Sequence, residues 1–275
     1  MFKLLFVFFA VVHVYATDRI VTLSPSLNEI VFALGKGGSV VGNTEHCKYP
    51  KESLKVTKVG GYFSPSLEKI LALEPTLVLM QKNNYKLNER LKQLGIKTKL
   101  VKIDRLTSIK ETILEIGQLL SKETEAKNIV QNIDEELKKL KDITKNKRVL
   151  IVMGHNTSLV SRIFVAGQNL YFDDIINASG NTNALQSKRK GQPMLNMENI
   201  IACNPDIVIL LAHSMEEKGL TRDELVNPWL ELPISAAKTK SVYIINKLYA
   251  GIPSDRLALF LKDFREILND YKNNN

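Results

Sequence analysis

LEKILALEPTLVL, residues 67–79, recurs without gaps as MENIIACNPDIVI, residues 197–209. Each copy has apolar residues at helical spacing around a glutamate, then a proline, then an apolar run typical of a buried strand. The copies share Glu, Ile, Ala and Pro at matching positions, which favours an internal repeat over a chance likeness between two helix–strand units. The sequence therefore predicts two similar lobes.

Strands and helices alternate on both sides of the repeated segments. Such alternation predicts α/β lobes with mostly parallel sheets that are covered by helices. The expected strands are residues 19–23, 39–42, 76–80, 97–103, 148–153, 206–211 and 241–245. The expected helices are residues 26–34, 66–73, 86–94, 108–120, 171–178, 197–202 and 254–271, with a capping box from Ser108 to Glu111.

One longer amphipathic helix separates the two halves. Residues 122–145 carry one apolar stripe on a densely charged segment, as in a solvated helix that packs along a single face. We expect this helix to bridge the lobes. The predicted organisation is a signal peptide at 1–16, an N-terminal α/β lobe at 17–120, the bridging helix at 121–147 and a C-terminal α/β lobe at 148–275.

The first residues are typical of a secretory signal peptide. Lys3 precedes an unbroken apolar run at residues 4–12, and small or β-branched residues lead to a cut after Ala16. No later segment has the roughly 18 apolar residues that a membrane span needs. We expect a soluble exported chain, and no lipid anchor because no cysteine lies near the cut. Cys47 and Cys203 lie in different halves, so we expect no disulfide.

Charge and motifs argue against two classes of function. The net charge is +9, but the lysines are interleaved with acidic residues and form no basic stripe with aromatic residues, so we expect no nucleic-acid partner. The sequence contains no phosphate-binding glycine motif, no nucleophile elbow and no His-Glu-x-x-His motif. We therefore expect a protein that is not an enzyme.

Candidate binding residues follow the predicted strands, because open α/β sheets bind ligands at the carboxyl ends of their strands. His46, His155, His213 and Lys82 all lie at such positions. A histidine there can bind a metal or donate to an anionic chelate, and the alternative is a polar loop side chain that faces water. The spacing of the histidines matches no zinc motif, so a site for a bare metal ion is the weaker hypothesis.

Aromatic residues in loops are the second kind of candidate. Tyr62, Phe63 and Tyr249 lie on no predicted core face, so they could form apolar walls for a flat ligand. Packing within the loops is the alternative. The phenolate of Tyr62 or Tyr249 would also suit a ligand that carries iron.

Glu68 and Glu198 occupy the same place in the two repeated segments. Their apolar neighbours form the buried face of each helix, so each glutamate should point to solvent. Two matching acids, one per lobe, could pair with arginines of a two-fold symmetric partner. The alternative is an ordinary solvated helix surface.

Five stretches resemble the periplasmic binding proteins of ABC importers for cobalamin, haem and ferric siderophores, the class III binding proteins. They are RIVTLSPSLNE at 19–29, residues 41–50, VGGYFSPSLEKI at 59–70, Glu198 with its Pro205–Asp206, and, less closely, YAGIPSDR at 249–256. The resemblance implies two lobes joined by one long rigid helix, with a metal chelate bound in the cleft between them. It also implies a periplasmic monomer that docks through Glu68 and Glu198 onto arginines of the importer's permease dimer.

The resemblance leaves the ligand open among cobalamin, haem, a ferric siderophore and a nickel complex. Cobalamin binders of this family use tryptophans in the cleft, and the single Trp229 has no predicted place there, whereas haem binders favour a tyrosine. An alternative is a protein for free or histidine-chelated nickel or iron, and a less favoured one is a two-lobed α/β enzyme. The predicted ligand-binding set is His46, Tyr62, Phe63, Lys82, His155, His213, Tyr249 and Arg256, with the three histidines as possible metal ligands.

Overall fold

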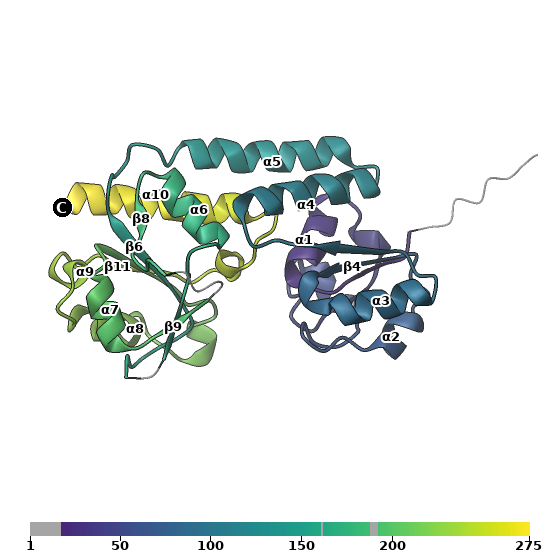
Figure 1. The fold of residues 1–275 in the computed structure, drawn as a ribbon, viewed down its shortest axis with the longest axis horizontal. Coiled ribbons are helices and arrows are strands. Elements are labelled where there is room, and N and C mark those ends of the chain that lie inside the picture. The colour runs from purple at the N-terminus through teal and green to yellow at the C-terminus, as the bar shows by residue number, and fades with distance from the viewer. Residues whose placement is uncertain (1–17, 161, 188–191) are drawn as a thin grey trace, which may run out of the picture.

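The first lobe is built on a parallel sheet. The computed structural model describes residues 18–160, 162–187 and 192–275, so the predicted signal peptide lies outside the described residues. Five parallel strands run in the order β3–β2–β1–β4–β5 (Figure 1). They are β1 (Ile20–Thr22), β2 (Val40–Asn43), β3 (Thr57–Lys58), β4 (Leu77–Gln81) and β5 (Thr98–Val101).

The second lobe is built on a mixed sheet. The order is β11–β10–β6–β7–β9, and β8 pairs with β6. β7 is antiparallel to both β6 and β9, whereas the other pairs are parallel. The sequence did not predict β7, β8 or β9, because they are too short to show an apolar run. The strands are β6 (Arg148–Met153), β7 (Ile163–Val165), β8 (Thr182–Asn183), β9 (Met194–Leu195), β10 (Ile207–Leu211) and β11 (Val242–Ile245).

Helices cover the faces of both sheets (Figure 1). α6 has the predicted bounds, and most of the others agree with prediction within a few residues, whereas α8 and α9 were not predicted. The helices are α1 (Pro25–Ala33), α2 (Leu67–Leu71), α3 (Tyr85–Gln93), α4 (Leu106–Leu119), α5 (Glu123–Lys138), α6 (Tyr171–Ala178), α7 (Met197–Cys203), α8 (Arg222–Leu230), α9 (Ser235–Lys238) and α10 (Leu257–Asn274).

Alternating residues of a strand pack into different cores, because successive side chains of a strand point to opposite faces of the sheet. In β1, Ile20 joins a large core that extends through both lobes, whereas Val21 joins a small core next to α2 and α3. In β10, Ile209 joins the large core, and Val208 joins a third core around α8. The large core therefore holds the two sheets together through apolar contact and not only through the chain connection.

The link between the lobes is a pair of helices. α4 and α5 pack against each other, α4 contacts α1 of the first lobe and α6 of the second, and α5 packs along α10 of the second lobe (Figure 1). The predicted helix at 122–145 is too long, since α5 ends at Lys138. Asp142 and Asn146 have φ of 64° and 58°, so the backbone leaves helical geometry there. The apolar stripe misled the prediction because Leu140 still packs into the large core beyond the helix end.

The repeated segments fold into matching units. Ser66 caps α2 and Asn196 caps α7, each by accepting the backbone N–H three residues on. The residues before the two prolines, Glu74 and Asn204, both adopt positive φ, 45° and 39°. Each unit then enters a strand, β4 or β10, that pairs with the first strand of its own lobe. The internal repeat is therefore confirmed at the level of caps, turns and pairing.

Two smaller predictions have different outcomes. The capping box from Ser108 to Glu111 is wrong, because α4 begins at Leu106 and Ser108 Oγ accepts a hydrogen bond from the Arg105 N–H at 3.0 Å. Cys47 and Cys203 are free thiols, as expected.

Over the described ranges, we find no helix that combines the length and the apolarity needed to cross a membrane.

Candidate ligand-binding cleft

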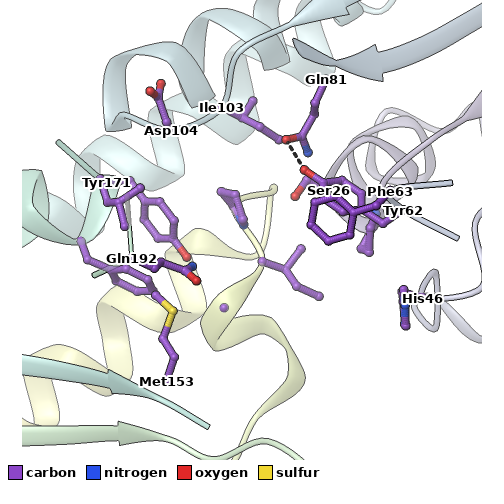
Figure 2. A pocket seen from close by; sticks show the side chains of 16 residues that line it. Ser26, His46, Tyr62, Phe63, Gln81, Ile103, Asp104, Met153, Tyr171 and Gln192 are labelled. Carbon is purple, nitrogen blue, oxygen red and sulfur yellow. Dashed lines mark hydrogen bonds between the residues drawn. The ribbon is translucent and has the colours of Figure 1, made fainter. Parts of the chain in front are cut away.

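A cleft of about 480 Å³ lies between the lobes (Figure 2). This volume falls in the range of small-molecule sites, which are mostly apolar with a few well-placed polar groups. Both lobes contribute to its walls. The lining residues are Pro25, Ser26, His46, Tyr62, Phe63, Gln81, Ile103, Asp104, Met153, Leu170, Tyr171, Phe172, Gln192, Gly251, Ile252 and Pro253.

Tyr62 and Phe63 form the aromatic part of the first-lobe wall. Their rings meet edge to face with centroids 4.6 Å apart, and Phe63 is 84% exposed. The Tyr62 hydroxyl donates to Gln81 Oε1 at 2.9 Å, and partial burial raises the pKa of this phenol. A large aromatic side chain this exposed has little packing role in the free protein, so it is available to cover a ligand.

A glycine turn presents these two rings. Gly60 has φ of 112°, and a Cβ there would lie 2.8 Å from the carbonyl oxygen of Ser64. Glycine is the residue that tolerates both the positive φ and the close backbone approach. The turn therefore fixes the positions of Tyr62 and Phe63 relative to the first sheet.

Tyr171 and Phe172, at the start of α6, form the aromatic part of the second-lobe wall. Their ring centroids are 4.1 Å apart, and Phe172 meets Phe260 of α10 edge to face at 5.2 Å. Met153, at the end of β6, lies next to them in the lining (Figure 2). The sequence predicted α6 correctly but did not place Tyr171 or Phe172 at the site. The sequence signal that could have identified them is a pair of aromatic residues at the start of a helix that follows a long loop.

Arg256 does not line the cleft, although it was predicted to bind ligand. Its Nε donates to Glu29 Oε2 at 3.0 Å, and the two side chains are 9% and 1% exposed. Ser254 Oγ also donates to Glu29, at 2.6 Å, and the guanidinium lies 3.8 Å from the Tyr49 ring centre. Arg256 thus joins the lobes directly behind the cleft residues Gly251–Pro253.

The three histidines do not come together. His46 lines the cleft, whereas His155 and His213 lie outside its lining with their rings 5.6 Å apart. His155 Nε2 lies 2.6 Å from the His213 carbonyl oxygen, and its Nδ1 lies 3.1 Å from Lys218 Nζ. Within residues 18–160, 162–187 and 192–275, no three His, Cys, Asp or Glu side chains form a group that could hold a metal ion.

The surroundings of His213 are positively charged. Burial, followed by the charges of His155, Lys218 and Lys48, lowers the pKa of His213. Lys48 comes from the first lobe, so this cluster brings basic groups from both lobes to the same region.

Two further predicted residues lie outside the lining. Lys82 directly follows the lining residue Gln81 and is exposed. The Tyr249 hydroxyl donates to Asp263 at 2.8 Å, and burial together with this bond raises the pKa of Tyr249 to about 12. Trp229 is fully buried in the core around α8 and does not reach the cleft.

Glu68 and Glu198 are both exposed in the first turn of their helices, α2 and α7. Figure 1 shows α2 and α7 on the same side of the molecule, one in each lobe and away from α5. The helices that carry the two glutamates therefore lie on the same side of the molecule.

Comparison with known proteins agrees with this architecture. A family model described as periplasmic binding protein matches residues 20–248. The vitamin B12-binding protein of Vibrio parahaemolyticus is 27% identical over 242 residues, which cover 87% of this chain and 85% of that protein. The high-affinity heme uptake system protein IsdE of Staphylococcus aureus is 25% identical and covers 78% of this chain and 75% of its own. The periplasmic heme-binding protein RhuT from Roseiflexus sp. RS-1 has a similar fold, with a TM-score of 0.76, 24% identity and coverage of 94% and 100%.

Proposed function

Since the chain belongs to the periplasmic binding protein family, we propose that its cleft captures a metal chelate, which the loaded protein delivers to the permease of an ABC importer. Members of this family are solute-binding proteins and not enzymes. The candidate ligands are cobalamin, haem and a ferric siderophore. The first two are named in the relatives described above, and the third comes from the sequence resemblance.

The observation that carries this proposal is the pair of aromatic walls. Tyr62 and Phe63 lie on one side of the cleft and Tyr171 lies on the other (Figure 2), and the next residue, Phe172, also belongs to the lining. The exposed Phe63 ring can supply large apolar contact area, whereas Tyr171 and Phe172 are 5% and 1% exposed and back the opposite wall. Apolar walls of this kind suit a broad, flat ligand. Among the described residues, the lining includes one carboxylate, Asp104, and one histidine, His46, so few of these groups are charged.

A free-metal carrier is less well supported. That alternative needs His46, His155 and His213 to act together, and only His46 lines the cleft. The His155 ring contacts both the His213 carbonyl and Lys218, so both of its nitrogens already have neighbours.

Binding can be tested with the full chain and four probes: hemin, cyanocobalamin, a ferric hydroxamate and nickel chloride. We expect one chelate to bind with one-to-one stoichiometry in calorimetry and nickel chloride to give no saturable signal. Phe63→Ala should weaken that binding about tenfold, because it removes an aromatic contact of roughly 1.4 kcal/mol. Its thermal midpoint should not change, because Phe63 is exposed.

Tyr85→Ala is the matched control, since Tyr85 is an exposed aromatic residue outside the cleft lining. It should leave affinity unchanged. Binding of nickel alone, or an equal loss of affinity in both variants, would contradict the proposal.

We also propose that residues 1–16 direct export and that the protein acts as a monomer. The first point rests on the charged start, the apolar run and the cleavage pattern. The second rests on the presence of both cleft walls and both exposed glutamates in one chain. N-terminal sequencing of the exported protein should begin at Thr17, and light scattering should give the mass of one chain.

A further inference from the structure

Tyr171 has an unusual environment for a tyrosine. Its side chain is 5% exposed and enters the cleft from the start of α6, on the side where Gln192 and Met153 lie (Figure 2). Its hydroxyl oxygen is buried and finds no hydrogen-bond partner in the described part of the chain. Tyr62 and Tyr249, by contrast, donate to Gln81 and Asp263.

Packing alone does not account for the hydroxyl. The Tyr171 ring lies against Phe172, which in turn packs on Phe260, so a phenylalanine at 171 would make the same apolar contacts. A buried hydroxyl without a partner costs about 1–3 kcal/mol, and buried polar groups in folded proteins are nearly always bonded. The free protein therefore carries a cost that a bound acceptor would remove, once the exposed side chain of Gln192, which lies beside Tyr171 in the lining (Figure 2), moves aside to admit it.

We infer that the Tyr171 hydroxyl donates a hydrogen bond to the bound ligand, and that the ligand accordingly presents a carboxylate or amide oxygen to the second-lobe wall. This inference rests on the proposed function and adds to it a binding residue and a requirement on the ligand. Haem carries carboxylates and cobalamin carries amides, so both supply such an acceptor.

The protonation state of Tyr171 fits a donor. Complete burial raises the pKa of this phenol far above its usual value. The side chain keeps its proton at neutral pH, because burial disfavours the charged phenolate. A neutral phenol donates a hydrogen bond, whereas a phenolate would be needed for a strong bond to iron.

The test compares the wild type with Tyr171→Phe, using hemin and cyanocobalamin as probes in calorimetry. We expect Tyr171→Phe to weaken binding of whichever probe the wild type binds by about 2- to 13-fold, the range for one hydrogen bond. The ligand-free variant should have a thermal midpoint equal to or above that of the wild type, because the substitution removes an unsatisfied buried hydroxyl. A residue with a merely structural role would not combine weaker binding with unchanged or higher stability.

Tyr243→Phe is the control, since Tyr243 donates to Asp270 at 2.8 Å and lies outside the cleft lining. It should lower the thermal midpoint and leave affinity unchanged. Equal affinity of Tyr171→Phe and wild type, or a lower midpoint of ligand-free Tyr171→Phe, would overturn the inference while leaving the proposed function intact.

One spectroscopic outcome and one binding outcome complete the test. The wild type with hemin could show a phenolate-to-iron absorption band that Tyr171→Phe lacks. That result would overturn the inferred hydrogen bond, because Tyr171 would then coordinate the metal. Absence of binding of both probes to the wild type would overturn the inference together with these two candidate ligands.

Discussion

At the scale of single residues, the contact between Glu29 and Arg256 joins the two lobes behind the cleft. The residues lie 227 positions apart, and both are almost fully buried. Removing one partner of such a pair leaves an uncompensated buried charge, which is strongly destabilising. This pair therefore favours one spacing of the lobes, and the cleft residues Gly251–Pro253 lie next to it in the chain.

Asp255 provides a prediction of pH dependence. Burial, reinforced by the nearby charge of Glu29, raises the pKa of Asp255 from 3.8 to about 6. Its Oδ1 has no hydrogen-bond partner within the described ranges. Between these two pKa values the folded state binds more protons than the unfolded state, so the free energy of unfolding should fall as pH rises from about 4 through about 6. The total fall from this residue is up to about 3 kcal/mol.

Asp255→Asn should remove that fall, because the amide does not ionise. In urea unfolding, the variant should match the wild type near pH 4 and exceed its stability at pH 8. Asp223→Asn is the control, because Asp223 is an exposed carboxylate of α8. Wild-type and Asp255→Asn curves that stay parallel across this pH range would contradict the prediction.

The sequence identified part of the site because strand exits are local features. His46, Tyr62 and Phe63 follow strands or turns of the first lobe, and all three line the cleft. A search of strand exits does not find Tyr171 and Phe172, since these residues begin a helix and do not follow a strand. Arg256 entered the predicted set with the segment 249–256 that resembles the family, and single-sequence patterns do not show its pairing with the distant Glu29.

At the scale of elements, α4 and α5 touch through a position without a side chain. A Cβ on Gly117 of α4 would lie 2.4 Å from the Ala126 Cβ and 3.0 Å from the Lys122 carbonyl oxygen. Neither neighbour is a flexible side-chain end, so the helices would have to separate. The close approach of this helix pair therefore depends on glycine.

Gly117→Ala should destabilise the protein although alanine is the better helix former. The gain in helix propensity is about 1 kcal/mol. Overpacking of a tight contact costs about 1–3 kcal/mol, and here it acts on a backbone oxygen and a methyl group that have little room to move. We expect a net loss of about 1 kcal/mol in the free energy of unfolding, measured by urea titration.

Gly38→Ala is the control for this prediction, because a Cβ at Gly38 would have no neighbour within 4 Å. It should leave stability unchanged or slightly higher. A stabilised Gly117→Ala variant would show that the helices can separate without cost.

Elements with strong periodicity were predicted well. β6 and α6 have the predicted bounds, because an apolar run or a helical pattern starts and stops clearly there. β7 and β9 pair antiparallel at the edge of the second sheet and have only three and two residues, too few for a pattern. The end of α5 was missed because the apolar stripe continues into a turn.

At the scale of the whole molecule, the repeat places one exposed glutamate in each lobe, on the helices α2 and α7 that lie on the same side of the molecule (Figure 1). The large core runs through both lobes, and Arg105, the N-cap residue of α4, adds a salt bridge to Asp174 of α6. The two lobes therefore hold Glu68 and Glu198 in a fixed relation. A partner with two-fold symmetry could contact both carboxylates at once, so the attachments would reinforce each other.

We predict that Glu68→Lys combined with Glu198→Lys abolishes association with the cognate permease and leaves ligand affinity unchanged. Each substitution replaces a carboxylate that an arginine could bind through two hydrogen bonds with a cation that repels it. Neither residue lines the cleft, so calorimetric titration with the chelate should match the wild type. Association is measured by co-sedimentation with vesicles that carry the importer, and each single substitution should give an intermediate loss.

Glu111→Lys combined with Glu135→Lys is the charge-matched control, because both glutamates are exposed on α4 and α5, away from α2 and α7 (Figure 1). The control should sediment with the vesicles as the wild type does, because these helices cover the opposite side of the molecule. Raising the salt concentration should weaken wild-type association but change the double variant little, since exposed ion pairs are screened. Equal loss in both double variants would mean that total charge governs association, and the two-point docking surface would then have no support.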